Sequence, residues 1–196
     1  VKDTRVTALG LYVEGLGSIR NFEKLVSLCD ELGKAIVVIK IGKSEHAQLS
    51  AVSHTASLAG NDKGASALMK RLGVARVNSL SEFIETLKVF HCHGRLSGSS
   101  VASVSCSGGE ASLIADICNG SQLLFPKLTK EQTNGLNSAL GAKVALANPL
   151  DYHTYIWGDA GKMAQTFISI MQDKIIDIGI IIVDFPRSDF CDPDAW

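Results

Sequence analysis

Short apolar runs alternate with helix-like segments along the chain, and this alternation limits it to few folds. The first runs cover residues 7–13 (TALGLYV) and 35–39 (AIVVI), each bounded by turn residues. Between them, Ser18 is placed to cap a helix over residues 19–32, whose apolar positions recur with helical spacing. Strand, helix and strand in this order predict a parallel pair with a right-handed crossover. The chain is therefore expected to fold as α/β, with mainly parallel sheets.

A glycine- and serine-rich segment, Gly94–Ser100 (GRLSGSS), interrupts the alternation near the middle of the chain. Such composition is typical of a linker. We therefore expect two domains, over residues 1–95 and 96–196. The strands expected in the second domain cover residues 101–106, 144–147 and 175–183.

Charge and composition exclude several classes of protein. The net charge is −1, so the basic footprint of a nucleic-acid binder is missing, and no apolar run reaches the ~20 residues of a membrane helix. Five scattered cysteines without CxxC spacing indicate neither a disulfide framework nor a zinc site, which suits the cytoplasm. Because the chain starts at Val1 and ends just after an apolar run, we expect a piece of a longer polypeptide.

Residues 41–60 (IGKSEHAQLSAVSHTASLAG) contain small and hydroxylated residues around one central histidine, His54. Ser53 and Thr55 flank it directly. A loop of this kind suits an imidazole that accepts a phosphoryl group, because the dianion formed needs N–H and O–H donors. The alternative is a histidine that caps a turn or fills a polar pocket.

Glu14 directly follows the first predicted strand. The carboxyl ends of parallel strands meet at one sheet edge, so we expect Glu14 to reach the loop that carries His54. A carboxylate bonded to one ring nitrogen would fix the tautomer and leave the other nitrogen free to attack. The alternative is a solvated loop carboxylate.

Ser107, Gly108 and Gly109 lie between a predicted strand and a predicted helix. Free backbone N–H groups at such a helix start can bind phosphate, although two glycines there often mark a turn alone. The segment His91-Cys92-His93 is not expected to bind metal, because adjacent residues on a helix do not share a face. No metal site is predicted.

Residues 152–157 (YHTYIW) hold a cluster of aromatic side chains. Tyr155 and Trp157 are candidates for a substrate pocket that takes a cationic or bulky apolar group. The alternative is that the cluster packs over the edge of the core.

Four motifs together resemble a known family. The string KIGKSEHAQLSAVSHTASLAGND resembles the phosphohistidine segment of the NDP-forming acyl-CoA synthetases, the superfamily of ADP-forming acetyl-CoA synthetase and succinyl-CoA synthetase. LYVEG, SCSGGEASLIADIC and ANPLD resemble its strand–Glu, Gly-Gly turn and GNPxD motifs, in the same order. The resemblance implies two flavodoxin-like domains, of which the first lacks its N-terminal part.

The resemblance also implies the chemistry of an acid–CoA ligase. His54 would carry the phosphoryl group from ATP to a carboxylic acid, and CoA would then displace phosphate from the acyl phosphate. Glu14 would orient His54, while Ser107, Gly108 and Gly109 would hold the phosphate with help from Ser53 and Thr55.

Parts of the family's machinery have no counterpart in this sequence. The family's CoA-binding and ATP-grasp domains, the latter with its Mg²⁺, are expected on the same chain or a partner subunit of an oligomer. ATP and CoA would be co-substrates that this piece does not bind tightly, and the piece alone would not complete the reaction. CSGG in place of NSGG and the aromatic segment after ANPLD depart from the family pattern and leave the acid open.

Two alternatives remain at this stage. The chain would be a non-catalytic acyl-CoA-sensing or regulatory module of a larger protein, such as a protein acetyltransferase. Otherwise it would be a flavodoxin-like domain that binds a small anion without chemistry. Retention of both His54 and Glu14 favours the ligase, since a sensor needs no phosphoryl acceptor.

Overall fold

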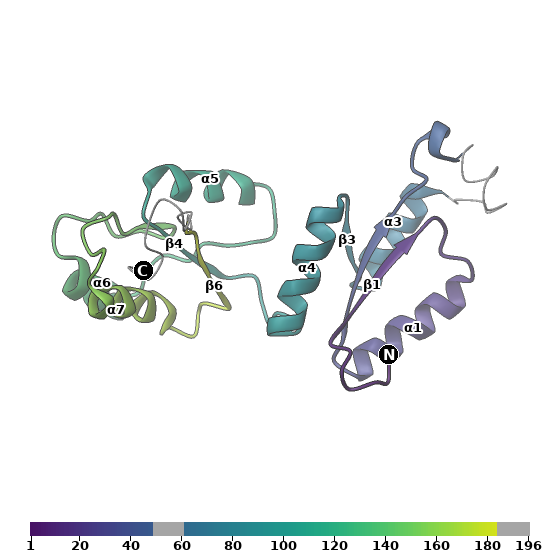
Figure 1. Cartoon of the computed structure of the whole chain (residues 1–196), viewed down its shortest axis with the longest axis horizontal. Helices are drawn as coiled ribbons and strands as arrows, with labels where there is room; N and C mark the ends of the chain where they lie inside the picture. Colours follow the sequence, from purple (N-terminus) through teal and green to yellow (C-terminus); the bar gives the residue numbers. More distant parts are fainter. Residues whose placement is uncertain (49–60, 184–196) are drawn as a thin grey trace, which may run out of the picture. The chain divides into compact units, whose positions relative to one another are not determined.

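A computed structural model describes residues 1–48 and 61–183 of the chain. The chain divides into two compact units, Val1–Arg95 and Leu96–Trp196, drawn in Figure 1. Ser53, His54 and Thr55 lie outside the described residues. None of the described helices is long and apolar enough to cross a membrane.

The sheet of the first unit contains three parallel strands in the order β1-β2-β3. Strand β1 covers Ala8–Val13, β2 covers Ala35–Lys40 and β3 covers Ala75–Val77. The central strand β2 is buried along its whole length, as expected for a parallel strand covered on both faces. The predicted parallel pairing of the first two strands is confirmed, with Val13 opposite Lys40 at their carboxyl ends.

Helices cover both faces of this sheet. Helices α1 (Ile19–Glu31) and α3 (Asp62–Arg71) pack on one face, and α4 (Leu80–His93) contacts β1 and β2. Figure 1 shows α1 and α4 on opposite sides of the sheet. Helix α4 approaches closely at Gly10, where a Cβ atom would lie 2.7 Å from Cζ of Phe83.

Side chains cap the two helices of one face, α1 and α3. Ser18 caps α1 and accepts a hydrogen bond from the Asn21 N–H, as predicted. Asn61 caps α3 by accepting a hydrogen bond from the Gly64 N–H. Asp62 lies in the first turn of α3 and pairs with Arg76.

The second unit has a sheet of three parallel strands in the order β5-β4-β6. Its strands are β4 (Val101–Ser105), β5 (Leu150–Asp151) and β6 (Ile178–Ile181). Its helices are α5 (Gly108–Cys118), α6 (Lys130–Leu140) and α7 (Ala160–Met171). Figure 1 shows α5 on one side of β4, and α6 and α7 on the other, where the apolar core lies.

Two strand predictions in the second unit were wrong in place or extent. Residues 144–147 form no strand, because Val144 packs into the core from a loop and pairing resumes only at β5. The last strand was expected over residues 175–183, but its start is a turn in which the Ile176 N–H bonds the Asp173 carbonyl. The predicted α/β class with parallel sheets is confirmed.

Candidate functional site

Glu14 lies at the carboxyl edge of the first sheet, one residue beyond β1. The neighbouring strand β2 ends level with it, and the Ile41 N–H donates to the Val13 carbonyl at 3.0 Å. Glu14 is half-buried. It therefore lies beside the start of the segment that leads to His54. Whether the two side chains meet stays a prediction, because His54 is outside the described residues.

Lys40 is a member of this edge that the sequence reasoning missed. It is the last residue of β2 and only 2% exposed. Its ammonium group donates to the backbone carbonyls of Glu14 and Ile41, at 3.0 Å each. Burial lowers the pKa of Lys40, because the charged form is disfavoured away from water. The sequence signal for this role was a lysine at the end of an otherwise apolar strand, Ala35–Lys40.

A cavity of about 480 Å³ opens next to Lys40. Its walls come from the loop after β1, the start of α1 and one face of α3 along the whole helix. Gly15 and Gly17 line it on the side of the loop, and Asn61 lines it at the start of α3. Small molecules can therefore approach the buried lysine from the side of the sheet that α1 and α3 cover.

The start of α5 forms the second candidate region. Ser107 is the N-cap residue, but its side chain makes no capping hydrogen bond, and its carbonyl accepts one from the Ser105 hydroxyl at 3.0 Å. Gly108 and Gly109 are exposed. First-turn backbone N–H groups lack intrahelical partners, so this turn has the donors that an anion needs.

Two carboxylates lie close to this helix start, and the sequence reasoning did not assign either of them. A Cβ atom at Gly108 would lie 3.2 Å from Oδ2 of Asp151, the residue that ends β5. Glu110 has a buried oxygen, Oε2, for which the described residues provide no hydrogen-bond partner. Negative charge is favourable at a helix N-terminus. The same charges would oppose a phosphate bound there.

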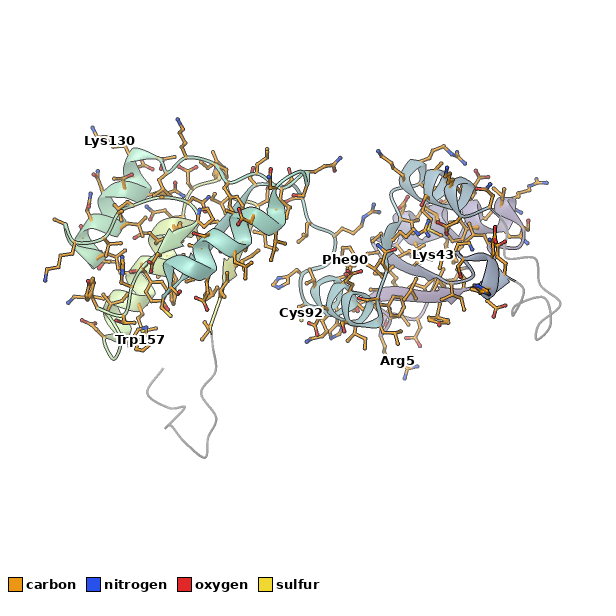
Figure 2. The ribbon with its side chains drawn as sticks, turned by 90° about the horizontal axis from the view of Figure 1, so that it is seen from above. Arg5, Lys43, Phe90, Cys92, Lys130 and Trp157 are labelled. Carbon is orange, nitrogen blue, oxygen red and sulfur yellow. The ribbon has the colours of Figure 1, made fainter. Side chains whose placement is uncertain are left out.

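The aromatic segment divides between the core and the surface of the second unit. Tyr152 is fully buried and meets Phe167 edge to face, with ring centroids 5.7 Å apart. Tyr155 is 65% exposed and stacks on His153, whose backbone N–H donates to Asp151. Trp157 is 47% exposed, at the surface position labelled in Figure 2. The substrate pocket predicted for Tyr155 and Trp157 stays a prediction.

The His91-Cys92-His93 segment ends α4 at the surface. Nδ1 of His91 lies 2.7 Å from the hydroxyl of Thr7. Within residues 1–48 and 61–183, no group of three or more His, Cys, Asp or Glu side chains is placed to hold a metal ion.

Comparison with known proteins gives related sequences over most of the chain. Residues 1–90 match the model of the succinyl-CoA ligase like flavodoxin domain. The chain is 31% identical over 179 residues to acetate–CoA ligase [ADP-forming] II subunit alpha of Pyrococcus furiosus, covering 91% of this chain and 38% of that protein. It is 28% identical over 185 residues to acetate–CoA ligase [ADP-forming] II of Archaeoglobus fulgidus, covering 93% and 27%. The chain thus spans less than half of these relatives.

A solved structure has a similar fold. It is the dinucleotide forming acetyl-coenzyme A synthetase 1 of Ca. Korarchaeum cryptofilum in complex with phosphate and ADP. The TM-score is 0.79 at 21% sequence identity, over 92% of this chain and 39% of that one. At this identity the likeness supports the fold.

Proposed function

The chain belongs to the superfamily of ADP-forming acyl-CoA synthetases, and from this premise we propose that it carries the phosphohistidine relay of an acid–CoA ligase. The relay would convert a carboxylic acid, CoA and ATP into an acyl-CoA. Because the chain spans 38% of one relative and 27% of another, the complete reaction would need further domains.

His54 would be the phosphoryl carrier. A ring nitrogen attacks the terminal phosphorus of ATP, the P–O bond to ADP breaks, and phosphohistidine forms. Glu14 would accept a hydrogen bond from the other ring nitrogen, which fixes the tautomer and stabilises positive charge on the ring. Ser53 and Thr55 would donate hydrogen bonds to the phosphoryl oxygens.

The phosphoryl group would then pass to the substrate acid. A carboxylate oxygen attacks phosphorus, the P–N bond breaks, and an acyl phosphate forms. The CoA thiol loses its proton and attacks the acyl carbon, so acyl-CoA forms and inorganic phosphate leaves. Backbone N–H groups at Ser107, Gly108 and Gly109 would hold the phosphate during these steps.

ATP and CoA are therefore proposed as co-substrates, and the acid is left open. CoA-binding and ATP-grasp domains, on the same chain or a partner subunit, would deliver them in a cytoplasmic oligomer. Mg²⁺ would neutralise phosphate charge at the ATP-grasp domain. The described residues of this chain contribute no metal-binding cluster to that step.

One observation carries the proposal. Glu14 and the first residue of the His54 segment, Ile41, directly follow the adjacent parallel strands β1 and β2 at the same sheet edge, and the Ile41 N–H donates to the Val13 carbonyl at 3.0 Å. A carboxylate is thereby held beside the segment that would carry the phosphoryl group.

The test is phosphorylation of the complete ligase that contains this chain, using ATP labelled at the terminal phosphate. We expect acid-labile label in the wild type and none after His54→Ala. His46→Ala, an exposed histidine of the same segment, is the matched control and should keep the label. Acid-labile label that survives His54→Ala would defeat the assignment. Label missing from the wild type itself would favour the regulatory module.

A further inference from the structure

We propose that Lys40 is a positioning residue that fixes Glu14 and the start of the His54 segment in one arrangement. The inference rests on the proposed function, since it assigns how the orienting carboxylate is held. Lys40 would act through backbone carbonyls, without touching the phosphoryl group itself.

The hydrogen bonds of Lys40 join two strand ends. Its ammonium donates to the carbonyl of Glu14, which follows β1, and to the carbonyl of Ile41, which follows β2, at 3.0 Å each. Both acceptors are main-chain atoms, so their positions do not depend on the side-chain rotamers of Glu14 and Ile41. The cation therefore acts as a clamp between the residue that orients and the segment that is phosphorylated.

The cost of burying Lys40 argues for a role beyond filling the core. Lys40 is 2% exposed, and buried ammonium groups are normally paired with a carboxylate. No salt bridge between described residues involves Lys40, and the nearby Asp62 carboxylate pairs with Arg76 at 2.6 Å. Lys40 lies on the same side of β2 as Ile36 and Val38, where an apolar side chain would pack without this cost.

Lys34 provides an internal comparison at the opposite end of the same strand. It immediately precedes β2, and its ammonium also donates to two backbone carbonyls, those of Val1 at 2.5 Å and Asp3 at 2.8 Å. The bonding pattern is alike, but Lys34 is half-buried and lies at the amino edge, away from Glu14. Substitution of Lys34 therefore controls for the loss of a lysine that ties backbone segments.

Phosphoramidate is the probe, because it phosphorylates histidine without ATP and so needs only this chain. The imidazole nitrogen attacks phosphorus, the P–N bond of phosphoramidate breaks, and ammonium leaves with the imidazole proton. Peptide mapping by mass spectrometry under neutral conditions gives the rate at His54 relative to His153, which lies in the other unit. The ratio removes differences in reagent dose.

We expect Lys40→Met to lower this ratio ten- to a hundredfold, roughly the loss that follows a misplacement of about 1 Å in a reactive site. Lys34→Met should leave the His54 ratio unchanged. Circular dichroism should show that both variants are folded. An unchanged ratio in Lys40→Met overturns the inference while the proposed function stands. A wild-type chain in which His54 reacts no faster than His153 overturns both.

The neighbouring cavity allows a test that a purely structural role would not pass. In Lys40→Ala, n-propylammonium can enter through the cavity of about 480 Å³ and replace the missing ammonium group. We expect the His54 ratio to recover with saturating dependence on the amine. Lys40→Met, whose side chain occupies the space, should not recover. If Lys40→Ala folds but the amine does not restore its His54 ratio, the clamp is contradicted. If Lys40→Met does not fold, Lys40→Ala with and without the amine gives the deciding measurement.

Discussion

The side chain of Asn148 hydrogen-bonds the backbone of Ser103 in the second sheet, as a neighbouring strand would. Its side-chain oxygen accepts from the Ser103 N–H at 3.1 Å, and its side-chain nitrogen donates to the Val101 carbonyl at 2.7 Å. These two bonds occupy the edge of β4 just before β5 begins at Leu150. The amide therefore satisfies backbone groups that the loop over residues 144–147 leaves unpaired.

Asn148→Ala should destabilise the second unit by about 2–6 kcal/mol. The substitution leaves the Ser103 N–H and the Val101 carbonyl without partners, and each such buried group costs roughly 1–3 kcal/mol. Urea unfolding followed by circular dichroism measures the change. Asn137→Ala, an exposed position on α6, should shift the midpoint little. Equal shifts in the two variants would show that the amide bonds contribute nothing.

Glu14→Gln should leave the fold intact and slow phosphorylation of His54 about tenfold or more, by analogy with the loss of other partners that orient histidine. The neutral amide keeps the shape of the side chain but no longer stabilises positive charge on the ring. The rate of label incorporation from ATP in the complete ligase is the measurement. Glu45→Gln, an exposed carboxylate of the His54 segment, is the control. An unchanged rate would remove Glu14 from the mechanism.

Local signals predicted most of the fold. The cap at Ser18 and the strand–helix–strand order of β1, α1 and β2 follow from short-range signals that the sequence displays. The strand expected over residues 144–147 failed because a side chain replaced the backbone as partner of β4. This exchange of partners depends on a contact between Asn148 and Ser103, which lie 45 residues apart in the sequence.

The candidate site divides in the same way. Glu14 follows a strand, so its position at the sheet edge could be predicted from the alternation of elements. Two other features of the site join segments that are distant in the sequence. Lys40 bonds Glu14, and Asp151 lies beside the start of α5. The periodicity of apolar residues does not predict which distant segments come together. Tertiary contacts of this kind are decided by packing, which a single sequence does not display.

Asp151→Asn should strengthen the binding of inorganic phosphate at the start of α5 by a few-fold. Oδ2 of Asp151 lies beside Gly108, and removal of its negative charge weakens repulsion of the anion at short range. The asparagine keeps the oxygen that accepts from the His153 N–H. Chemical shifts of the Gly108 and Gly109 amides during phosphate titration give the affinity.

The control for this charge effect lies on the same helix. Asp116→Asn removes an exposed carboxylate near the carboxyl end of α5 and should change the affinity little. If Asp151→Asn binds phosphate no better than the wild type, Ser107, Gly108 and Gly109 do not hold the anion.

Tyr152→Phe should flatten the loss of stability at alkaline pH. Burial raises the pKa of the Tyr152 hydroxyl above its usual value, which is about 10 in unfolded chains. A folded-state pKa above the unfolded value contributes stability that is present below about pH 10 and lost as pH rises through the folded pKa. Phenylalanine has no proton to lose, so the variant's unfolding free energy should fall less steeply above about pH 10.

Near pH 7 the same substitution should change the unfolding free energy by no more than about 1 kcal/mol, because none of the described residues forms a hydrogen bond with the buried Tyr152 hydroxyl. Urea midpoints at a series of pH values between neutrality and strong alkali give both the change in stability near pH 7 and the slope of stability with pH in the alkaline range. Tyr12→Phe, at a position 59% exposed in the first unit, should keep the wild-type alkaline slope. A parallel decline in Tyr152→Phe and the wild type would mean that ionisation of Tyr152 is not coupled to unfolding.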